Sequence, residues 1–511
     1  MAISSVTGLQ ETMTTQADTS AKPDIAVLCA LASMVLVLHA IVRNGYGFHR
    51  DELQTLDDAR HMAAGFVAYP PLTPLAGRIA IALFGISPWV LRLPAAIVNA
   101  VSLVIVGLTA REMGGRRLAQ VVALMMSLGV AMVFSTMLQY NTFDYLAWAL
   151  AAYFMARLLR TGDARWWVGV GAAIGLGVLS KYSVALLAAS IIGGVIALPS
   201  QRHWLRSRWF YLGMLTTLVV ASPNLIWLAT HHFITLEMEH SIHARDIRWG
   251  RTAGYWSDQI RFTLLAIPLV IAGIVSLVRS AQFRLLAFFF LGPLVLFALV
   301  KGRGYYLLPA YIPVNAAAGV VLERWLAGRT RPLQTAIVSV VCVALLADTV
   351  ALSSRFVQIA KPGSAFFRWQ WRNSSDIADD IGWPEFVASV ANAANTLSPT
   401  ERDRLVVLAE NYGEAGALEL YGASYGLPQP ISEVNSWWAR GFGSPPPDNV
   451  LVTGGDMPGL APHFESCRVV GQVHIPYGVQ NEESKYHLPI IFCQNLRGSW
   501  TEVWAHDRKF G

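Results

Sequence analysis

Charged residues are scarce in this sequence. Only 14% of its 511 residues are Asp, Glu, Lys or Arg, whereas ordinary soluble domains have about 25%. Hydrophobic residues make up 54% of the chain. This balance excludes an ordinary soluble globular protein and predicts a polytopic membrane protein. The net charge of +6 is the kind of excess that membrane topology produces, so it gives no reason to expect a nucleic-acid partner.

The signatures of several other protein classes are also missing. Residues 1–24 lack the basic start and the small-residue cleavage site of a signal peptide, so we expect the first apolar segment to stay as a membrane anchor. No glycine precedes Lys181 where a P-loop requires one, which leaves an ATP-driven machine unsupported. The chain has only four cysteines, of which Cys467 and Cys493 lie in a polar region and can pair in an oxidising compartment.

Long apolar segments with short polar breaks make up most of the chain. Because a membrane-spanning helix needs about 20 apolar residues, we predict eleven such helices, at about 25–42, 88–110, 118–137, 142–159, 166–180, 183–198, 209–230, 262–278, 285–300, 306–322 and 333–352. In the fifth of these, Gly171 and Gly175 have the spacing of a close-packing face between membrane helices.

Basic residues concentrate in alternate loops. With the N-terminus in the cytoplasm, the inner loops hold Arg111, Arg116, Arg117, Arg157, Arg160, Arg165, Arg202, Arg206, Arg208, Arg279, Arg284, Arg324, Arg329 and Arg331. The short outer breaks hold Lys181, Lys301 and Arg303. The positive-inside rule therefore places the loop with Asp51, the His-rich loop after Thr230 and everything beyond Ser353 on the outer side.

Because the N-terminus is cytoplasmic and the number of predicted membrane helices is odd, the C-terminal part is expected on the outer side. We therefore expect a cytoplasmic tail (1–24), a membrane domain (25–353) and a periplasmic domain (354–511). The last part is polar and rich in turn residues, and four segments have the composition of strands: 404–409, 449–453, 467–473 and 488–493. The fold class expected is a polytopic α-helical membrane protein with a C-terminal soluble α/β domain.

Three acidic residues at the outer membrane surface are candidates for chemistry. Asp51 and Glu52 directly follow the first apolar segment and are preceded by Arg50, although a solvated helix end would have the same composition. Asp144 lies just inside the outer end of the fourth helix. A carboxylate there is costly unless it faces a polar cavity or a cation, which favours a functional role over helix capping.

Two further outer segments carry cations. Lys301, Arg303 and Tyr306 lie in one basic and aromatic stretch that suits either a clamp for a lipid phosphate or an interfacial anchor. His240 and His243 are three residues apart, a spacing that allows two metal ligands on one helical face. No full ligand signature accompanies them, so an amphipathic interfacial helix is favoured over a metal site.

The order of these motifs resembles a known family. After the Asp51-Glu52 pair come Pro70-Pro71-Leu72 behind a glycine and an aromatic residue, then Leu91-Arg92-Leu93-Pro94 and a basic turn at 111–117. The acid of the fourth helix, Ser180-Lys181-Tyr182 and Tyr306-Leu307-Leu308-Pro309 complete the pattern. Over about residues 25–320 the chain resembles the C-type membrane glycosyltransferases of the protein O-mannosyltransferase branch, a family 39-like group. That branch includes the bacterial enzymes that transfer aminoarabinose or galacturonate to lipid A.

The resemblance implies a multi-pass protein of the bacterial inner membrane that takes a sugar from a polyprenyl-phosphate donor. The sugar moves, with inversion, to a glycolipid such as lipid A, another glycan or a protein on the outer face. Asp51 corresponds to the catalytic base beside Glu52, and Asp144 to a second acid near the reaction centre. The donor phosphate is expected at Arg50, Lys181, Lys301, Arg303 and Tyr306.

The chemistry needs no cofactor beyond these side chains, although a divalent metal ion is the alternative holder of the phosphate. Some lipid A-modifying members carry an acid-lysine pair where this chain has Ala68-Tyr69 before Pro70. This difference weakens the case for a phosphate or metal contact of the aminoarabinose type. A flippase for lipid-linked saccharides is the second reading, but it predicts inverted repeats and midplane charges that the sequence lacks. A membrane-anchored binding module is the third.

Overall fold

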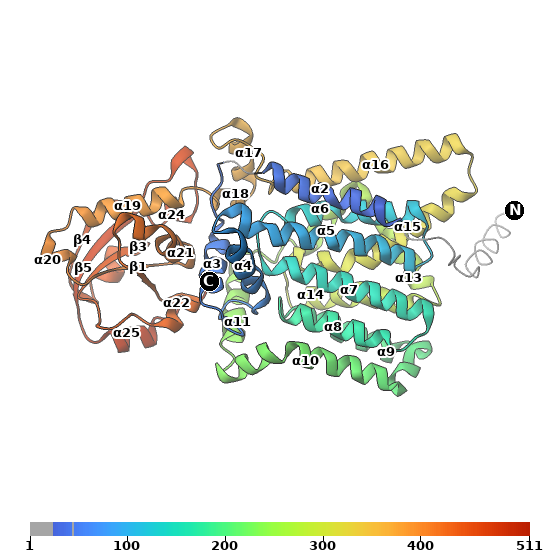
Figure 1. Cartoon of the computed structure of the whole chain (residues 1–511), viewed down its shortest axis with the longest axis horizontal. Helices are drawn as coiled ribbons and strands as arrows, with labels where there is room; N and C mark the ends of the chain where they lie inside the picture. The colour runs from blue at the N-terminus through green and yellow to red at the C-terminus, as the bar shows by residue number, and fades with distance from the viewer. Residues whose placement is uncertain (1–23, 43–44) are drawn as a thin grey trace.

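The computed structural model describes residues 24–42 and 45–511. The long helices lie side by side in one large body, and a smaller α/β body covers one end of them (Figure 1). We call the smaller body, residues 354–511, the C-terminal domain. The predicted cytoplasmic tail lies almost wholly outside the described residues.

Each of the predicted apolar segments overlaps a helix. These helices are α2 (Ile25–Ile41), α5 (Pro88–Glu112), α6 (Arg117–Phe134), α7 (Tyr140–Thr161), α8 (Trp166–Val178), α9 (Val184–Ala197), α10 (Arg208–Thr230), α13 (Ile267–Arg279), α14 (Arg284–Leu299), α15 (Ile312–Ala327) and α16 (Arg331–Ser353). The fold is therefore that of a multi-pass α-helical membrane protein.

The predicted number of eleven spans is not confirmed. In the described residues, 6 helices are long and apolar enough to cross a membrane, or up to 7 if the bent pair of α9 and the following 3-10 helix counts as one. Several of the others are too short, such as α8 with 13 residues. Where a helix is broken, the sequence still shows an apolar segment long enough to span the membrane. The structure divides that segment into pieces that are each too short.

Close packing between α8 and α10 confirms the prediction for the glycine pair. A Cβ atom on Gly171 would lie 1.9 Å from the carbonyl oxygen of Gly213, and one on Gly175 would lie 2.7 Å from Cβ of Val220. Neither position has room for a larger residue. The two helices therefore pack backbone to backbone, as small residues allow in membranes.

Short helices line the end of the bundle that faces the C-terminal domain. They are α3 (Arg50–Arg60), α4 (Leu72–Phe84), α11 (Ile234–Arg248) and α12 (Tyr255–Thr263). The start of α3 is fixed by a capping box: the His49 ring accepts from the amide of Asp51, and the Glu52 carboxylate accepts from the amide of His49 at 3.0 Å. This cap determines where the first acids of α3 point.

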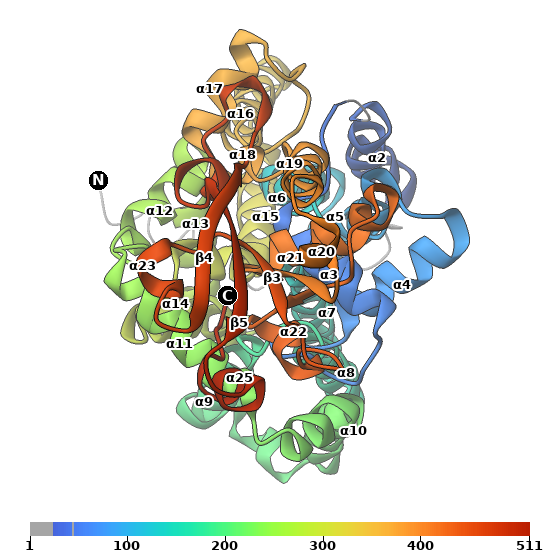
Figure 2. The ribbon, with the colours of Figure 1, turned by 90° about the vertical axis from the view of Figure 1, so that its left-hand side faces the viewer.

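The C-terminal domain is built on a five-stranded sheet of order β2-β1-β3-β5-β4. Figure 2 shows β3, β5 and β4 side by side. Its strands are β1 (Leu405–Ala409), β2 (Pro430–Ser432), β3 (Asn449–Thr453), β4 (Phe464–Gln472) and β5 (Pro489–Leu496). The strands β1, β2 and β3 are parallel, and β5 is antiparallel to both β3 and β4. Four strands overlap the predicted segments. The short β2 was not predicted, since three residues that begin with proline carry no strand pattern.

Helices cover this sheet and connect it to the bundle. They are α17 (Ala365–Asn373), α18 (Ser375–Ala378), α19 (Trp383–Asn395), α20 (Pro399–Arg402), α21 (Tyr412–Tyr421), α22 (Asn435–Arg440), α23 (Met457–Leu460), α24 (Glu482–Lys485) and α25 (Trp500–His506). The helix α21 begins directly after Asn411.

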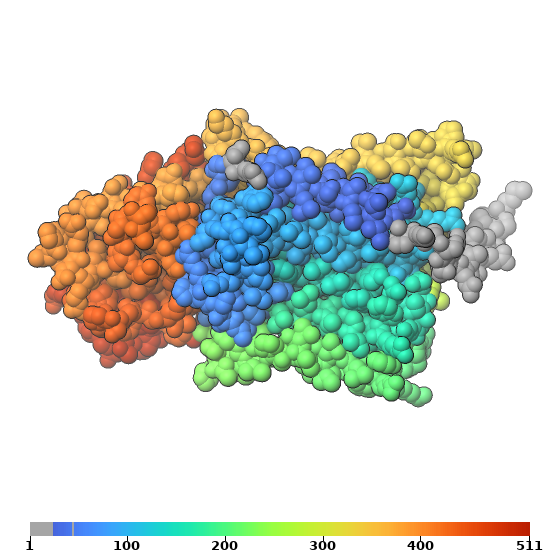
Figure 3. Space-filling model, viewed as in Figure 1, coloured from blue at the N-terminus to red at the C-terminus, as the bar shows by residue number. Residues whose placement is uncertain are grey.

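The C-terminal domain and α3 share one hydrophobic core. Leu53 and Leu56 of α3 belong to the same buried cluster as Leu451 and Phe492 of the sheet. A Cβ atom on Gly416 of α21 would lie 2.8 Å from Cβ of Leu53, so the two helices approach closely. The space-filling view shows continuous contact between the two bodies (Figure 3). The domain is thus packed onto the segment that carries the predicted acids.

The predicted pairing of Cys467 with Cys493 is confirmed. The two residues are register partners on β4 and β5 and form a disulfide. Replacing both by Ser is expected to lower the free energy of unfolding of the C-terminal domain by about 2–4 kcal/mol, the usual range for a disulfide. Thermal unfolding in lipid discs measures this, with Cys29→Ser/Cys342→Ser as the control because both of these are free thiols. Two titratable thiols from Cys467 and Cys493 in protein exported by the cell would contradict the pairing.

Candidate active site

A cavity of about 1400 Å³ lies where the helix ends meet the C-terminal domain. Its walls come from α3, the turn between α8 and α9, α11, the segment before α15 and several loops of the C-terminal domain. Six of the predicted site residues line it: Arg50, Asp51, Lys181, Lys301, Arg303 and Tyr306. Segments that are far apart in the sequence therefore place an acid and several cations around one space.

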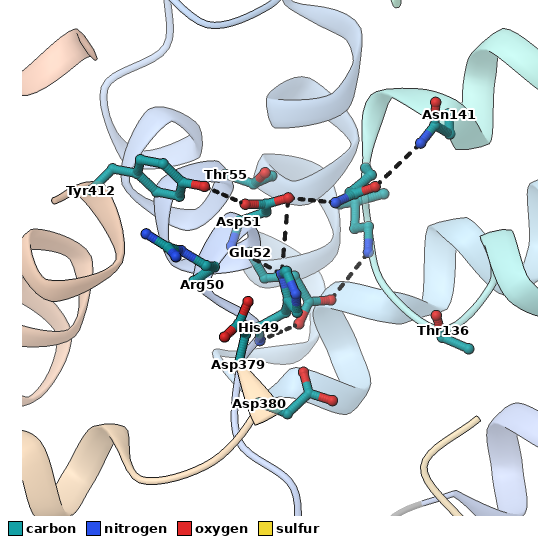
Figure 4. A network of polar contacts seen from close by, with 12 residues as sticks. His49, Arg50, Asp51, Glu52, Thr55, Thr136, Asn141, Asp379, Asp380 and Tyr412 are labelled. Atoms are coloured by element: carbon teal, nitrogen blue, oxygen red, sulfur yellow. Dashed lines mark hydrogen bonds and ion pairs between the residues drawn. The ribbon is translucent and has the colours of Figure 1, made fainter. Parts of the chain in front are cut away.

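Asp51 lies in the first turn of α3 with about a third of its side chain exposed to the cavity. The hydroxyl of Tyr412 donates to Oδ1 at 2.7 Å (Figure 4). The side-chain amide of Gln139 donates to Oδ2 at 2.5 Å. The His49 ring is 4.0 Å from the same carboxylate. Asp51 is thus a carboxylate held in one orientation with part of its surface open, which suits a general base.

Glu52 does not line the cavity. Its side chain is fully buried and receives three hydrogen bonds from Arg92, the shortest at 2.7 Å, and one from the amide of Leu138 at 3.1 Å. Arg92 also pairs with Asp380 at 3.2 Å. The carboxylate therefore has no free access to a substrate, and its position supports a structural role rather than the predicted catalytic one.

Lys181 lies in the turn between α8 and α9, within a cage of tyrosine rings. Its ammonium is 4.1 Å from the ring centre of Tyr306, 5.0 Å from that of Tyr140 and 5.2 Å from that of Tyr305. It donates to the side-chain oxygen of Asn141 at 2.9 Å. Burial lowers the pKa of Lys181 to about 8 against the opposing charge of Asp144. An anion in the cavity would stabilise the charged form of this lysine.

Asp144 is buried behind this cage and does not line the cavity. It accepts a hydrogen bond from the indole of Trp148 at 2.9 Å and interacts electrostatically with Lys181. The structure therefore brings Asp144 into the site only through Lys181. Its position favours a supporting role for the cation over direct contact with a substrate.

The remaining predicted cations differ in how strongly they are neutralised. Arg303 forms a bidentate pair with Asp246 of α11, at 2.6 and 2.5 Å. Arg50 pairs with Glu482 and lies over the ring of Tyr412. Lys301 is exposed and makes no ion pair with any of the residues that the structure describes. Among the predicted cations, those available to an anion are therefore Lys181 and Lys301, with the ring of Tyr306 beside Lys181.

Several lining residues were not singled out from the sequence. Gln139 and Tyr412 hold Asp51, and Asp246 holds Arg303. Tyr412 lies three residues after the end of β1, at the carboxyl end of parallel strands, where binding sites of α/β sheets usually lie. This position after a strand is the feature of the sequence that could have identified Tyr412.

One group of side chains that could hold a metal ion lies outside the cavity. Across residues 24–42 and 45–511, the one group of three His, Asp or Glu side chains close enough to hold an ion is Asp57, His61 and Glu419. Arg440 already pairs with Asp57, and Arg60 with Glu419 at 3.3 Å. These guanidinium groups supply the positive charge there, so the donor set does not fit a metal ion. His240 and His243 line the cavity on α11, in a helix as the amphipathic interpretation expects.

A buried His–Glu pair lies in the cavity wall of the C-terminal domain. The ring of His487 is 2.7 Å from Glu414, whose carboxylate also accepts from Thr453. Burial opposes the protonation of His487, but the hydrogen bond and charge of Glu414 outweigh it and raise the pKa from 6.5 to about 9. The pair is thus an ion pair in the folded protein at neutral pH.

This pair predicts a pH dependence of stability. Because the pKa is raised on folding, the stabilisation is fully present below pH 6.5 and is lost as the pH rises through about 9. We expect wild type to lose about 1.5–3 kcal/mol of unfolding free energy over this range, the size of a charged hydrogen bond. Thermal unfolding of wild type, His487→Gln and the exposed control His506→Gln at several pH values tests this. An equal pH dependence in His487→Gln would contradict it.

Both the helical bundle and the C-terminal domain are covered by matches to solved structures. ArnT from Cupriavidus metallidurans bound to undecaprenyl phosphate aligns with a TM-score of 0.58 and 14% sequence identity, over 92% of this chain and 97% of that one. Its apo structure aligns with a TM-score of 0.60 and 13% identity over the same shares. The fold is that of a C-type membrane glycosyltransferase. The C-type fold thus includes both the helical bundle and the C-terminal domain.

Sequence comparison agrees for part of the chain. Residues 68–227 match the family model described as dolichyl-phosphate-mannose-protein mannosyltransferase. No curated protein matches the chain in sequence. AglB, the archaeal oligosaccharyltransferase from Archaeoglobus fulgidus in complex with an inhibitory peptide and a dolichol-phosphate, is a more distant match, with a TM-score of 0.48 and 12% identity over 84% of this chain and 69% of that one. The family model covers the helices from α4 into α10, and this part of the chain includes Lys181.

Proposed function

We propose that the protein transfers a sugar from a polyprenyl-phosphate donor to an acceptor hydroxyl, with inversion at the anomeric carbon. The observation that carries this proposal is the cavity, which has an open carboxylate at Asp51 and cations at Lys181 and Lys301 around one space. The match to the mannosyltransferase family model and the C-type fold support it. The undecaprenyl phosphate bound to ArnT indicates the kind of lipid carrier.

Each part of the cavity has a step in this reaction. Asp51 takes the proton from the acceptor hydroxyl while the oxygen of that hydroxyl attacks the anomeric carbon. The bond from that carbon to the phosphate oxygen breaks, and the polyprenyl phosphate leaves with the bonding electrons. Lys181, Lys301 and Tyr306 stabilise the negative charge on the leaving phosphate. Atoms and charge balance without a nucleotide.

The distribution of basic residues supports the side of the membrane that we propose. Basic residues concentrate at the end of the bundle away from the cavity, as in the cytoplasmic loops of membrane proteins. The proposal therefore places the cavity and the C-terminal domain in the periplasm of a bacterium, at the outer face of the inner membrane. The acceptor is a glycolipid such as lipid A, another glycan or a protein, which are alike in offering a hydroxyl.

A donor screen tests the proposal. Purified protein in lipid discs is incubated with a panel of polyprenyl-phosphate sugars and candidate acceptors, and lipid products are identified by mass spectrometry. We expect wild type to release free polyprenyl phosphate from one class of donor, which names the sugar. Lys181→Met is expected to raise the donor concentration needed for half-maximal rate, with Lys361→Met, outside the cavity, as the control. No release from any donor with every acceptor class present would contradict the proposal.

A further inference from the structure

Both oxygens of Asp51 are held by neutral donors from distant parts of the chain. Gln139 precedes α7 in the membrane domain, whereas Tyr412 is the first residue of α21 in the C-terminal domain. Figure 4 shows the Tyr412 hydroxyl and the Asp51 carboxylate pointing at each other across the boundary between the two bodies. The carboxylate of the proposed base is therefore oriented jointly by both bodies.

The position of Tyr412 is itself fixed by its surroundings. The side chain of Asn411 caps α21 by accepting from the amide of Glu414 at 2.9 Å. A Cβ atom on Gly413 would lie 3.0 Å from Cβ of Arg50, so the start of α21 lies tightly against the start of α3. The Arg50 guanidinium is 5.0 Å from the ring centre of Tyr412 and pairs with Glu482. The ring is thus held between α3 and the C-terminal domain.

The Tyr412 hydroxyl remains a donor at any physiological pH. Burial, and then the charge of Asp51, raise the pKa of Tyr412 well above its ordinary value. A carboxylate has about four acceptor positions, and Tyr412 and Gln139 occupy one on each oxygen. Asp51 keeps acceptor capacity on its cavity side for the hydroxyl of an incoming substrate.

We propose that Tyr412 is a positioning residue of the active site, through which the C-terminal domain completes the catalytic base. The proposal rests on the proposed function for the role of Asp51 as base. The C-terminal domain then contributes to the chemical step as well as to binding. Any motion that separates α21 from α3 would leave Asp51 held by Gln139 alone and would lower its efficiency as a base.

Removing the hydroxyl is expected to change the pH dependence of the reaction. A donor to the ionised carboxylate favours that form, so Tyr412→Phe should move the acid limb of the rate profile to higher pH. Other groups that act on Asp51 are the same in both proteins: His49 and Arg50 of α3, Tyr140 of α7, Asp376 of α18 and Asp379 after it. A difference between the two profiles therefore reports on Tyr412.

The kinetic test compares Tyr412→Phe with Tyr421→Phe, the same change on the same helix outside the cavity. We expect kcat of Tyr412→Phe to fall about 10- to 100-fold, the usual cost of a mispositioned catalytic group. KM for the donor, whose phosphate binds around Lys181, should stay the same, and Tyr421→Phe should match wild type. An unchanged kcat and pH profile in Tyr412→Phe would overturn the proposal.

A second test needs no turnover, so that it stands if the proposed function fails. Thermal unfolding of Asp51→Ala, Tyr412→Phe and the double variant in lipid discs forms a double-mutant cycle. If the hydroxyl holds the carboxylate, the double variant loses less than the sum of the two single shifts. Additive shifts would overturn the positioning role. If wild type releases no polyprenyl phosphate from any donor and the shifts in the double-mutant cycle are not additive, the transfer reaction is contradicted. The contact between Tyr412 and Asp51 is then still supported.

Discussion

Replacing Asp51 by Asn is expected to lower the rate of sugar transfer by about 10²- to 10⁴-fold, the usual contribution of a general base. Asn keeps the size of the side chain and can still accept from Tyr412, but it cannot take a proton from the acceptor. We therefore expect kcat to fall while the donor still binds, because the phosphate end of the cavity lies around Lys181. Initial rates of polyprenyl phosphate release measure this.

The matched control is Asp403→Asn, the same change at an exposed acid of the C-terminal domain outside the cavity. It should transfer sugar at the wild-type rate. Thermal unfolding of Asp51→Asn should show only a small decrease in the midpoint, since the Asn amide has a single acceptor oxygen and can accept from one of the two donors. Full transfer activity in Asp51→Asn would show that another group is the base.

Replacing Arg92 by Met is expected to lower the free energy of unfolding by about 3–5 kcal/mol, the cost of removing one partner from a buried ion pair. Arg92 is almost fully buried, and its loss leaves the carboxylates of Glu52 and Asp380 without their counter-charge. The three residues join α5, the start of α3 and the C-terminal domain. Thermal unfolding in lipid discs should therefore show a large decrease in the midpoint.

A second substitution separates charge from packing. In Arg92→Met/Glu52→Gln one uncompensated carboxylate is neutralised, so the double variant should recover part of the lost stability. Arg78→Met, at an exposed position of α4, is the control and should unfold like wild type. Equal stability of Arg92→Met and wild type would contradict the structural role that we assign to Glu52.

Elements that depend on local pattern could be predicted from the sequence. Apolar length located the helices, and strand composition located β1, β3, β4 and β5 in the C-terminal domain. The glycine spacing in α8 predicted its close packing, and the two cysteines of the polar region predicted their disulfide. Each of these follows from a few neighbouring residues or from a pair with few alternatives.

The functions of Asp51 and Glu52 could not be separated from the sequence. Neighbouring residues of a helix point about 100° apart, so one of them can face a cavity while the other faces the core. Which one does so depends on Arg92, a residue 40 positions away from Glu52. The contact of Tyr412 with Asp51 joins residues 361 positions apart and depends on how the C-terminal domain packs onto α3. No local pattern carries that information.

The fate of the phosphate–sugar bond tests the central claim most directly, since it separates a transferase from a flippase. Protein in proteoliposomes is given the donor identified by the screen together with an acceptor, and the lipid is followed by mass spectrometry. The proposed function predicts free polyprenyl phosphate and glycosylated acceptor in equal amounts with wild type, and about 10²- to 10⁴-fold less of both in the same time with Asp51→Asn. Intact donor that crosses the bilayer with its sugar still attached would contradict it and would identify the cavity as part of a transport path.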